Sequence, residues 1–412
     1  MRRAVSPVTL ITVFCVAEIF GMTGAVTFPA LLPTFIDTWA LSNTDAGWIN
    51  GIYYAGYLFA VPVLVSLTDR VAPRRVFFLC MAISALANLG FALAADGFWT
   101  ALAFRLVAGV GLAGTYMPGL KLLGDHLRHL AADKDQSRAV AFYTSSFGIG
   151  TSLSYFLAGE VAAALDWRWA FAIAAAGPVA AAALMAAVLP REDPPHTQMP
   201  DTHLLDFRPV LRCRAVMAYV LAYTAHNFEL FAFRSWIVAY LVFAAATGPD
   251  ATIWSATAIA ALVNLLGLPA SVLGNEVARR IGRHRTITIV MLTSALLAGS
   301  IGFAAGAPFT LVVVLCLIYG VTITADSSAI TAGVVDAAPT GYRGATMAVH
   351  SCIGFIGAFA GPLAFGVVLD LSSAGATGGE TIQSWGLTFL FSGLVMVALG
   401  AVALAVRGRE RA

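Results

Sequence analysis

Eight ionisable side chains lie inside apolar stretches of the sequence, where a charge needs a partner or a function. They are Glu18, Arg105, Glu160, His226, Glu229, Arg234, Asp326 and His350. An ionised side chain at the centre of a bilayer costs about 2.5–3.5 kcal/mol on insertion scales, so such groups usually face a cavity or another polar group. Buried carboxylates and histidines can take up and release protons, and arginine binds anions. These residue types therefore predict the handling of protons and anions.

The composition defines the medium around these groups. Hydrophobic residues make up 59% of the chain and charged residues 11%, and the mean hydropathy is +0.83. Soluble domains carry about 25% charged residues, so most of this chain must lie in lipid. A net charge of +2 gives no basic field that would indicate nucleic acid. The five cysteines form no CxxC pair, so we expect reduced packing residues.

Twelve apolar runs are long enough to cross a bilayer as helices, which takes about 20 residues. Their approximate bounds are 8–34, 46–66, 76–95, 99–124, 138–165, 169–189, 214–245, 251–275, 286–306, 308–336, 344–370 and 384–406. The first run is too long for the apolar core of a signal peptide, so we expect a retained membrane helix. No segment shows the alternation of apolar and polar residues that is typical of transmembrane β-barrel strands. The sequence predicts an all-α membrane protein with twelve transmembrane helices.

Basic residues predict the orientation of these helices. With both termini in the cytoplasm, the inside segments hold 20 arginines and lysines and the outside loops hold only Arg168. Cytoplasmic loops carry such an excess in membrane proteins. Arginine outnumbers lysine 22 to 2 and alanine is abundant, which is typical of a GC-rich bacterial genome. We expect a multi-pass protein of the bacterial cytoplasmic (inner) membrane.

The chain predicts two similar halves joined by a polar linker. The proline-rich, charged stretch in 190–213 separates a six-helix half at 1–189 from another at 214–412. At an offset near 207 residues, "AEIFGM" matches "AHNFEL" in outline, and "SRAVAFYTSSFGIG" parallels "YRGATMAVHSCIGF". Internal repeats of this kind are common in secondary transporters, where the substrate site lies between the repeats near mid-membrane.

Three motifs resemble those of the major facilitator superfamily. The loop after the second run keeps an acid and three arginines of that family's signature, "RLVAGVG" (105–111) is similar to its helix-4 motif, and "DWRWAF" (166–171) to its entry to helix 6. Within the superfamily the chain resembles the cyanate- and nitrate-transporter-like group. The resemblance implies that helices 1, 4, 7 and 10 line a central cavity. It also implies a cytoplasmic gate at the loop after the second helix, formed by Asp69, Arg70, Arg74 and Arg75. The alternative is that these charges only set the orientation of the helices in the membrane.

The stretch "HNFELFAFRSW" (226–236) carries the densest chemistry. Helical residues advance by about 100° each, so Glu229 and Arg234 lie about 140° apart and cannot pair well with each other. The expected polar side holds His226, Glu229, Arg234, Tyr219, Tyr223, Trp236 and Tyr240, and the opposite, lipid-like side holds Phe228, Phe231 and Ala232. We expect substrate binding by His226, Arg234, Tyr223 and Trp236, and proton coupling by Glu229. A structural hydrogen-bond cluster is the alternative. A metal site at His226-x-x-Glu229 lacks further ligands nearby.

Other helices supply further candidates. Glu18 lies about 15 Å into the first helix, at 1.5 Å per residue, and is predicted as a proton carrier. Asp326 shares a face with a tyrosine and a threonine and could carry protons or balance a cation. Arg105 either forms a structural ion pair with Glu160 or reads a substrate anion together with Tyr116 on the same face.

These features favour a proton-coupled secondary transporter that moves a small solute, expected to be an anion, by alternating access. The alternative is a proton-driven exporter of drugs or lipophilic cations. No GxSxG or HExxH motif supports an enzyme, and no GxxxxGK[ST] loop supports ATP drive. The expected partners are a small-molecule substrate, protons and the lipid bilayer, without nucleic acid, cofactor or metal. The chain is expected to act as a monomer.

Overall fold

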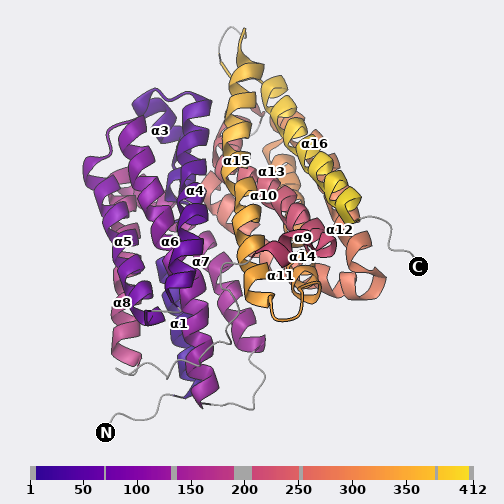
Figure 1. The fold of residues 1–412 in the computed structure, drawn as a ribbon. Helices are drawn as coiled ribbons and strands as arrows, with labels where there is room; N and C mark the ends of the chain where they lie inside the picture. The colour runs from indigo at the N-terminus through magenta and orange to yellow at the C-terminus, as the bar shows by residue number, and fades with distance from the viewer. Residues whose placement is uncertain are drawn as a thin grey trace. The chain divides into compact units, whose positions relative to one another are not determined.

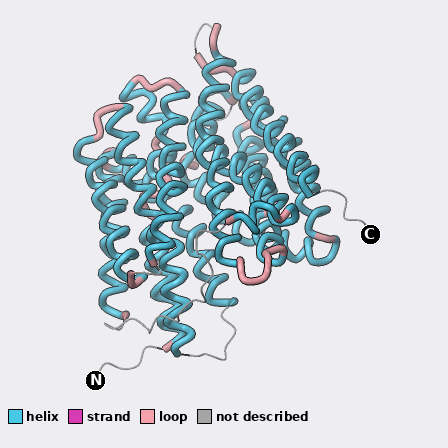
Figure 2. Tube along the Cα trace, in the orientation of Figure 1, coloured by secondary structure: helices cyan, strands magenta, loops and turns pink. Residues whose placement is uncertain are grey.

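The computed structural model describes residues 6–68, 71–130, 137–189, 207–249, 254–375 and 379–407. In these ranges the chain forms helices and turns and no strand (Figures 1 and 2). The helices are α1 (Pro7–Gly21), α2 (Thr27–Ala30), α3 (Leu32–Trp39), α4 (Asn43–Leu67), α5 (Pro73–Ala94), α6 (Phe98–Leu130), α7 (Ser137–Ala164), α8 (Trp167–Val188), α9 (Arg208–Arg212), α10 (Arg214–Thr247), α11 (Ala256–Ile281), α12 (Arg283–Ile301), the 3-10 helix η1 (Gly302–Gly306), α13 (Phe309–Thr324), α14 (Ser327–Asp336), α15 (Arg343–Ser373) and α16 (Ile382–Arg407).

These helices accommodate all twelve apolar runs, which confirms the predicted all-α membrane fold. In the described part of the chain, nine helical spans are long and apolar enough to cross a membrane. α4 and α7 are 25 and 28 residues long. The first run is divided among α1, α2 and α3, and the tenth between α13 and α14. The first interruption provides partners for Arg105, and the second places Asp326 at the start of α14.

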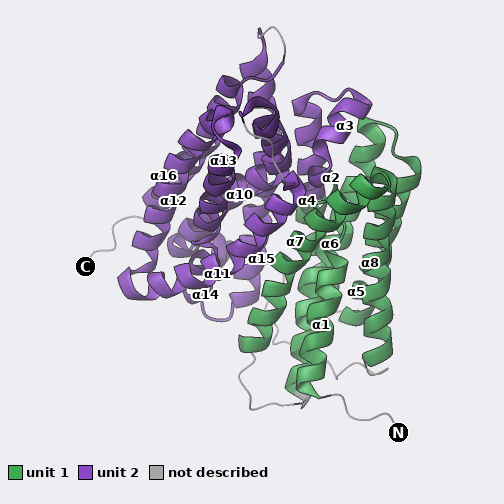
Figure 3. Ribbon diagram, turned by 180° about the vertical axis from the view of Figure 1, so that it is seen from behind, with its two compact units in different colours: residues 1–28, 56–202 green, residues 29–55, 203–412 purple. Residues whose placement is uncertain are grey.

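The chain folds as two compact units, coloured separately in Figure 3. Unit 1 comprises residues 1–28 and 56–202, and unit 2 comprises residues 29–55 and 203–412. Unit 2 therefore contains α3 and the beginning of α4 together with α9 to α16. The division into halves at 1–189 and 214–412 remains a prediction, and most of its linker lies outside the described residues.

In unit 1, side chains from two other helices secure the break after α1. Arg105 of α6 donates to the carbonyls of Gly24 and Ala25, at 3.3 and 3.0 Å. Ser154 of α7 donates to the carbonyl of Thr23 at 2.7 Å. Backbone groups inside a membrane protein need such partners because lipid offers none. Polar residues of α6 and α7 thus stabilise a non-helical turn within the unit.

In unit 2, α10 is surrounded by other helices. The prediction of a lipid-like side at Phe228, Phe231 and Ala232 is wrong: these residues are 6%, 5% and 1% exposed. The Phe231 ring packs against Tyr54 at 4.4 Å and Phe355 at 5.8 Å between ring centroids. An apolar helix face is as compatible with a packed protein interior as with lipid, and periodicity alone cannot separate the two.

A second break separates α13 from α14 and places Asp326 at the start of α14. Gly274 of α11 allows this close packing, because a Cβ at that position would lie 1.7 Å from the carbonyl oxygen of Ala325. Ser271 and Ser328 also meet across the same two elements, with their hydroxyl oxygens 2.6 Å apart. The break thus turns a carboxylate into the interior of unit 2.

Candidate functional site

The structure brings together His226 and Asp326, two candidates that lie 100 residues apart in the sequence. Nδ1 of His226 on α10 lies 2.8 Å from Oδ1 of Asp326, and both side chains are 2% exposed. An imidazole ring that faces a carboxylate in a buried position makes this pair a candidate for the handling of protons.

Aromatic and imidazole rings extend this pair toward α15. The ring of Tyr223 stacks on His350 at 4.0 Å and on His226 at 5.9 Å between centroids. Nδ1 of His350 is buried and has no hydrogen-bond partner among the described residues. Tyr223 and His226 were both predicted as substrate ligands, and the structure places them side by side. His350, one of the eight ionisable residues in apolar sequence, belongs to the same cluster.

Glu229 lies one helical turn beyond His226 and has separate partners. Its Oε2 accepts a hydrogen bond from Ser294 of α12 and its Oε1 one from Tyr319 of α13, each at 2.9 Å. The residue is 3% exposed. Both carboxylate oxygens are therefore held by hydroxyl groups from two different helices. This arrangement suits an anchor between helices, and the predicted proton-coupling role of Glu229 remains a prediction.

Arg234 lines a small pocket within unit 2. The pocket lies between α10, α11 and α13. Its polar lining consists of Arg234, Asn264 and Thr324, and its other walls are apolar. The guanidinium carbon of Arg234 lies 5.5 Å from the centroid of the Phe231 ring. A partly exposed guanidinium beside an amide and a hydroxyl can bind a carboxylate or another small anion.

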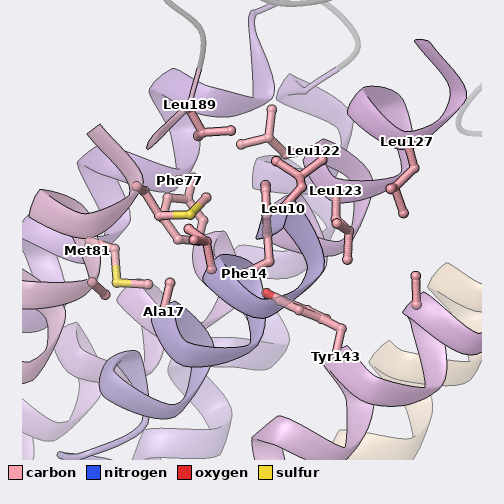
Figure 4. Close-up of a cluster of buried hydrophobic side chains, with 14 residues drawn as sticks. Leu10, Phe14, Ala17, Phe77, Met81, Leu122, Leu123, Leu127, Tyr143 and Leu189 are labelled. Atoms are coloured by element: carbon pink, nitrogen blue, oxygen red, sulfur yellow. The ribbon is translucent and has the colours of Figure 1, made fainter. Parts of the chain in front are cut away.

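In unit 1, Glu18 is buried against a tyrosine pair. The hydroxyl of Tyr143 on α7 donates to Oε2 of Glu18 at 2.9 Å, and Glu18 is 2% exposed. Figure 4 shows Tyr143 among apolar side chains, with its hydroxyl directed toward the helix that carries Phe14. Oε1 of Glu18 is buried and has no hydrogen-bond partner among the described residues. A carboxyl group with one unoccupied oxygen can hold a proton there.

Tyr116 and Arg105, predicted together as anion ligands, have different surroundings. Tyr116 stacks on Tyr143 at 5.8 Å between ring centroids, so it belongs to the Glu18 cluster. Arg105 is 2% exposed and donates to backbone carbonyls in the break after α1. Glu160, the alternative partner predicted for Arg105, is exposed. The carbonyls of the broken helix take the place that the sequence assigned to a carboxylate.

Trp236 lies in an aromatic core. It is 0% exposed, and its indole N–H donates to the carbonyl of Pro362 at 3.0 Å. Its ring stacks on Phe365 at 5.4 Å and meets Trp385 edge-on at 6.3 Å. These contacts favour a role in packing α10 against α15 and α16. Its predicted part in substrate binding is therefore not supported by this geometry.

The predicted gate is described only in part. Asp69 and Arg70 lie outside the described residues. Arg74 is partly buried, and its guanidinium carbon lies 5.5 Å from the centroid of the Phe78 ring. Arg75 is exposed. The gating role of these four residues remains a prediction.

Sequence reasoning missed a polar contact between α4 and α15 within unit 2. The carboxylate of Asp370 accepts hydrogen bonds from the backbone N–H groups of Asn43 and Thr44, at 3.1 and 2.8 Å, and from the Thr44 hydroxyl at 2.6 Å. A carboxylate at a helix N-terminus pairs with unsatisfied N–H groups and with the helix dipole. The position of Asp370 at the end of an apolar run gave no signal of this contact.

The long apolar helices of the described residues indicate a multi-pass membrane protein. A sequence model described as Major Facilitator Superfamily matches residues 13–362, well over half of the chain, so the chain belongs to that family. The family identifies a transporter rather than an enzyme.

Two curated proteins and one solved structure resemble the chain. It is 28% identical over 152 residues to the niacin transporter NiaP of Acinetobacter baylyi, a match of 37% of this chain and 33% of that protein. It is 28% identical over 215 residues to the probable sphingolipid transporter spinster homolog 2 of Arabidopsis thaliana, covering 48% and 43%. The chain thus matches less than half the length of each.

A crystal structure of a bacterial homolog to the human lysosomal transporter spinster, in an inward-facing and occupied conformation, has the same fold. The TM-score is 0.78 at 15% identity, over 98% of this chain and 97% of that one. At this identity the likeness establishes the fold alone.

Proposed function

We propose that this transporter moves a small organic anion together with protons by alternating access. The observation that carries the proposal is the arrangement along α10. His226, paired with Asp326, can store a proton, and Arg234, eight residues further on, lines a pocket. Eight residues correspond to about 12 Å along a helix. A proton site and an anion site on one helix give a physical basis for coupling their occupancy.

Niacin supports the choice of an anion. It is a small aromatic acid, and NiaP, which is named for its transport, resembles part of this chain. The pocket that Arg234 lines combines one cation with two neutral polar side chains and apolar walls. This combination suits a carboxylate on a small apolar body. Niacin is therefore the first compound to test, followed by other small carboxylates.

An amphiphilic cation is the second candidate substrate. The buried carboxylate of Glu18 lies beside Tyr116 and Tyr143, and aromatic rings with an acid suit a lipophilic cation. The resemblance to a probable sphingolipid transporter supports an amphiphile. Dependence of transport on the sign of the substrate charge separates the two candidates.

Orientation and location complete the proposal. The excess of arginine on one set of loops supports a bacterial cytoplasmic membrane with both chain termini in the cytoplasm. A cysteine introduced in the linker 190–206 should react with impermeant reagents only after the membrane is opened. Labelling from outside intact cells would contradict this orientation.

The test of the anion site uses Arg234→Ala and Arg234→Lys in purified protein. Hydrogen bonds to charged groups contribute about 1.5–3 kcal/mol, so the alanine variant should bind the anion roughly 10- to 150-fold more weakly. Lysine keeps the charge but loses the planar fork, so it should recover only part of the affinity. Binding and melting temperature are measured on the same preparations.

Arg168→Ala is the control, because the Arg168 guanidinium also lies over an aromatic ring, with its carbon 4.4 Å from the Trp167 centroid, and no transport role is predicted for this exposed residue of unit 1. It should leave the affinity unchanged. Unchanged affinity in Arg234→Ala, with a large fall in melting temperature, would refute the binding role and leave Arg234 as a structural residue.

A further inference from the structure

An apolar groove with a basic end lies on unit 2, away from the pocket of Arg234. It has a volume of about 660 Å³ and runs between α10, α12 and α16. α12 and α16 lie side by side in both Figure 1 and Figure 3. Small residues of α16 create the hollow: Gly400 and Ala401 face Met291 of α12, and a Cβ at Gly400 would lie 3.0 Å from the Met291 sulfur.

The groove is polar at one end only. His284, at the start of α12, and Arg407, at the end of α16, both line it. The ring of His284 stacks on Tyr219 at 4.9 Å, and its Nε2 lies 3.0 Å from the tyrosine hydroxyl oxygen. The two basic side chains thus lie at the ends of neighbouring helices. The ends of transmembrane helices lie at the depth of the phospholipid headgroups.

From this end the groove leads toward the middle of the membrane. Its lining on α12 extends from His284 to Leu292, about 12 Å at 1.5 Å per residue. Leu292 and Leu404 on its rim are 50% and 46% exposed, and Leu296 beyond it is 74% exposed. The apolar lining thus continues into side chains that face lipid in a protein of this family.

We propose that the groove holds one acyl chain of an anionic phospholipid, whose phosphate binds Arg407 and His284. Charge complementarity identifies the headgroup, because basic pockets between transmembrane helices select anionic lipids. The apolar floor and the open leucine rim identify the acyl chain. The occupant belongs to the bilayer and is separate from the transported solute.

The experiment equilibrates the detergent-purified protein with equal amounts of phosphatidylglycerol and phosphatidylcholine and measures retained lipid by native mass spectrometry. The unmodified protein should retain phosphatidylglycerol in preference. Arg407→Gln should lower the ratio of the two lipids about fivefold, since one basic side chain near an anionic surface contributes about 1 kcal/mol. Total retained lipid should change little, because the groove stays open.

Ala401→Phe fills the groove and should reduce retention of both lipids. Val397→Phe fills its inner end and gives the same result should the first variant fail to fold. Arg285→Gln is the matched control: Arg285 is exposed beside His284 but does not line the groove. Glycerol phosphate, which has no acyl chain, should not displace the lipid.

Three results would overturn the proposal. They are an equal loss of preference in Arg285→Gln, unchanged lipid retention in both groove-filling variants, and displacement of the lipid by glycerol phosphate. The first indicates a diffuse basic surface, the second a different lipid position, and the third a site for free phosphate.

Discussion

Glu18 on the 15-residue α1 of unit 1 and Glu229 on the 34-residue α10 of unit 2 are both buried glutamates, yet their surroundings differ. Glu229 has a hydroxyl donor on each carboxylate oxygen, whereas Glu18 has one donor and a second oxygen with no partner among the described residues. A fully bonded carboxylate is costly to disturb. A half-bonded one can change protonation with less reorganisation. From this difference we propose that Glu229 anchors helices and that Glu18 exchanges protons, which would revise the proton-coupling role predicted for Glu229.

The sequence repeat supports the same distinction. When "AEIFGM" is placed on "AHNFEL", Glu18 corresponds to His226 rather than to Glu229. His226 is the residue that faces Asp326 at 2.8 Å. The position equivalent to Glu18 thus belongs to the buried pair that we propose as the proton site of unit 2. We infer that each unit contributes one exchangeable site, and that Glu229 is an addition of unit 2 that ties α10 to α12 and α13.

The largest expected effect is on coupling. Glu18→Gln should abolish solute accumulation driven by a pH gradient but spare solute exchange, because the amide oxygen can still accept from Tyr143 while the proton site is lost. Glu229→Gln is the matched variant and should retain accumulation. Uptake and exchange are measured in proteoliposomes. Solute accumulation by the Glu18→Gln variant, or loss of accumulation in both variants, would contradict the different roles of Glu18 and Glu229.

The second-largest expected effect is on stability, and here the loss of Glu229 should matter more than the loss of Glu18. Glu229→Ala leaves the hydroxyls of Ser294 and Tyr319 without an acceptor, each at a cost of about 1–3 kcal/mol. Glu18→Ala leaves only Tyr143, which also lies 3.3 Å from the Tyr116 carbonyl oxygen. The Glu229 variant should therefore lose at least about 2 kcal/mol more, measured by unfolding in detergent. Equal losses would show that the number of donors does not decide the role.

The pair of His226 and Asp326 gives a smaller but more specific effect. A double-mutant cycle with His226→Gln and Asp326→Asn should show a coupling energy of about 0.5–3 kcal/mol in stability, as groups in direct contact do. Glu18→Gln combined with Asp326→Asn serves as the control and should be additive, because the two residues belong to different units. Additive stability changes for His226→Gln and Asp326→Asn would show that the two side chains do not interact.

The smallest effect concerns pH and lies outside the membrane spans. Burial raises the pKa of Glu380 above its ordinary value, while hydrogen bonds from Asn43 and Trp385 oppose the shift. The folded protein therefore binds this proton more tightly than the unfolded chain, and stability falls as pH rises through the raised pKa.

Glu380→Gln removes this titration and keeps an oxygen for the Trp385 indole N–H, which donates to Glu380 at 2.8 Å. The slope of melting temperature against pH should become less negative in the variant above pH 4.5. An unchanged slope in Glu380→Gln would contradict the assignment.

The spans and the family were predictable because hydrophobic runs and loop charges act locally. The breaks were not. The run 8–34 reads as one apolar helix, although Gly21, Gly24 and Pro29 mark the region where it separates into α1, α2 and α3. The position of Arg105 depends on the carbonyls that this break exposes. Its partners could not be read from a list of acidic residues.

The site was predictable by residue type and only partly by contact. His226 and Asp326 are recognisable as titratable groups in apolar sequence, but their pairing depends on how α13 and α14 meet α10. Tyr143 was missed, and Tyr319, the tyrosine expected to share a face with Asp326, donates to Glu229 instead. The partners of tyrosine hydroxyl groups are set by packing, which the sequence does not show. Trp236 is the opposite case. It was predicted to bind substrate because it shares a helix side with polar residues, but its ring packs in an aromatic core.

The central claim is that solute and protons move together. The most direct measurement uses the purified protein in liposomes that carry a pH-sensitive dye inside, with no imposed gradient and with niacin and a panel of small carboxylates added outside. The account predicts that a transported carboxylate acidifies the interior, and that Glu18→Gln abolishes the acidification while exchange of the same solute continues. Transport of a carboxylate by the unmodified protein with no change in internal pH would contradict it.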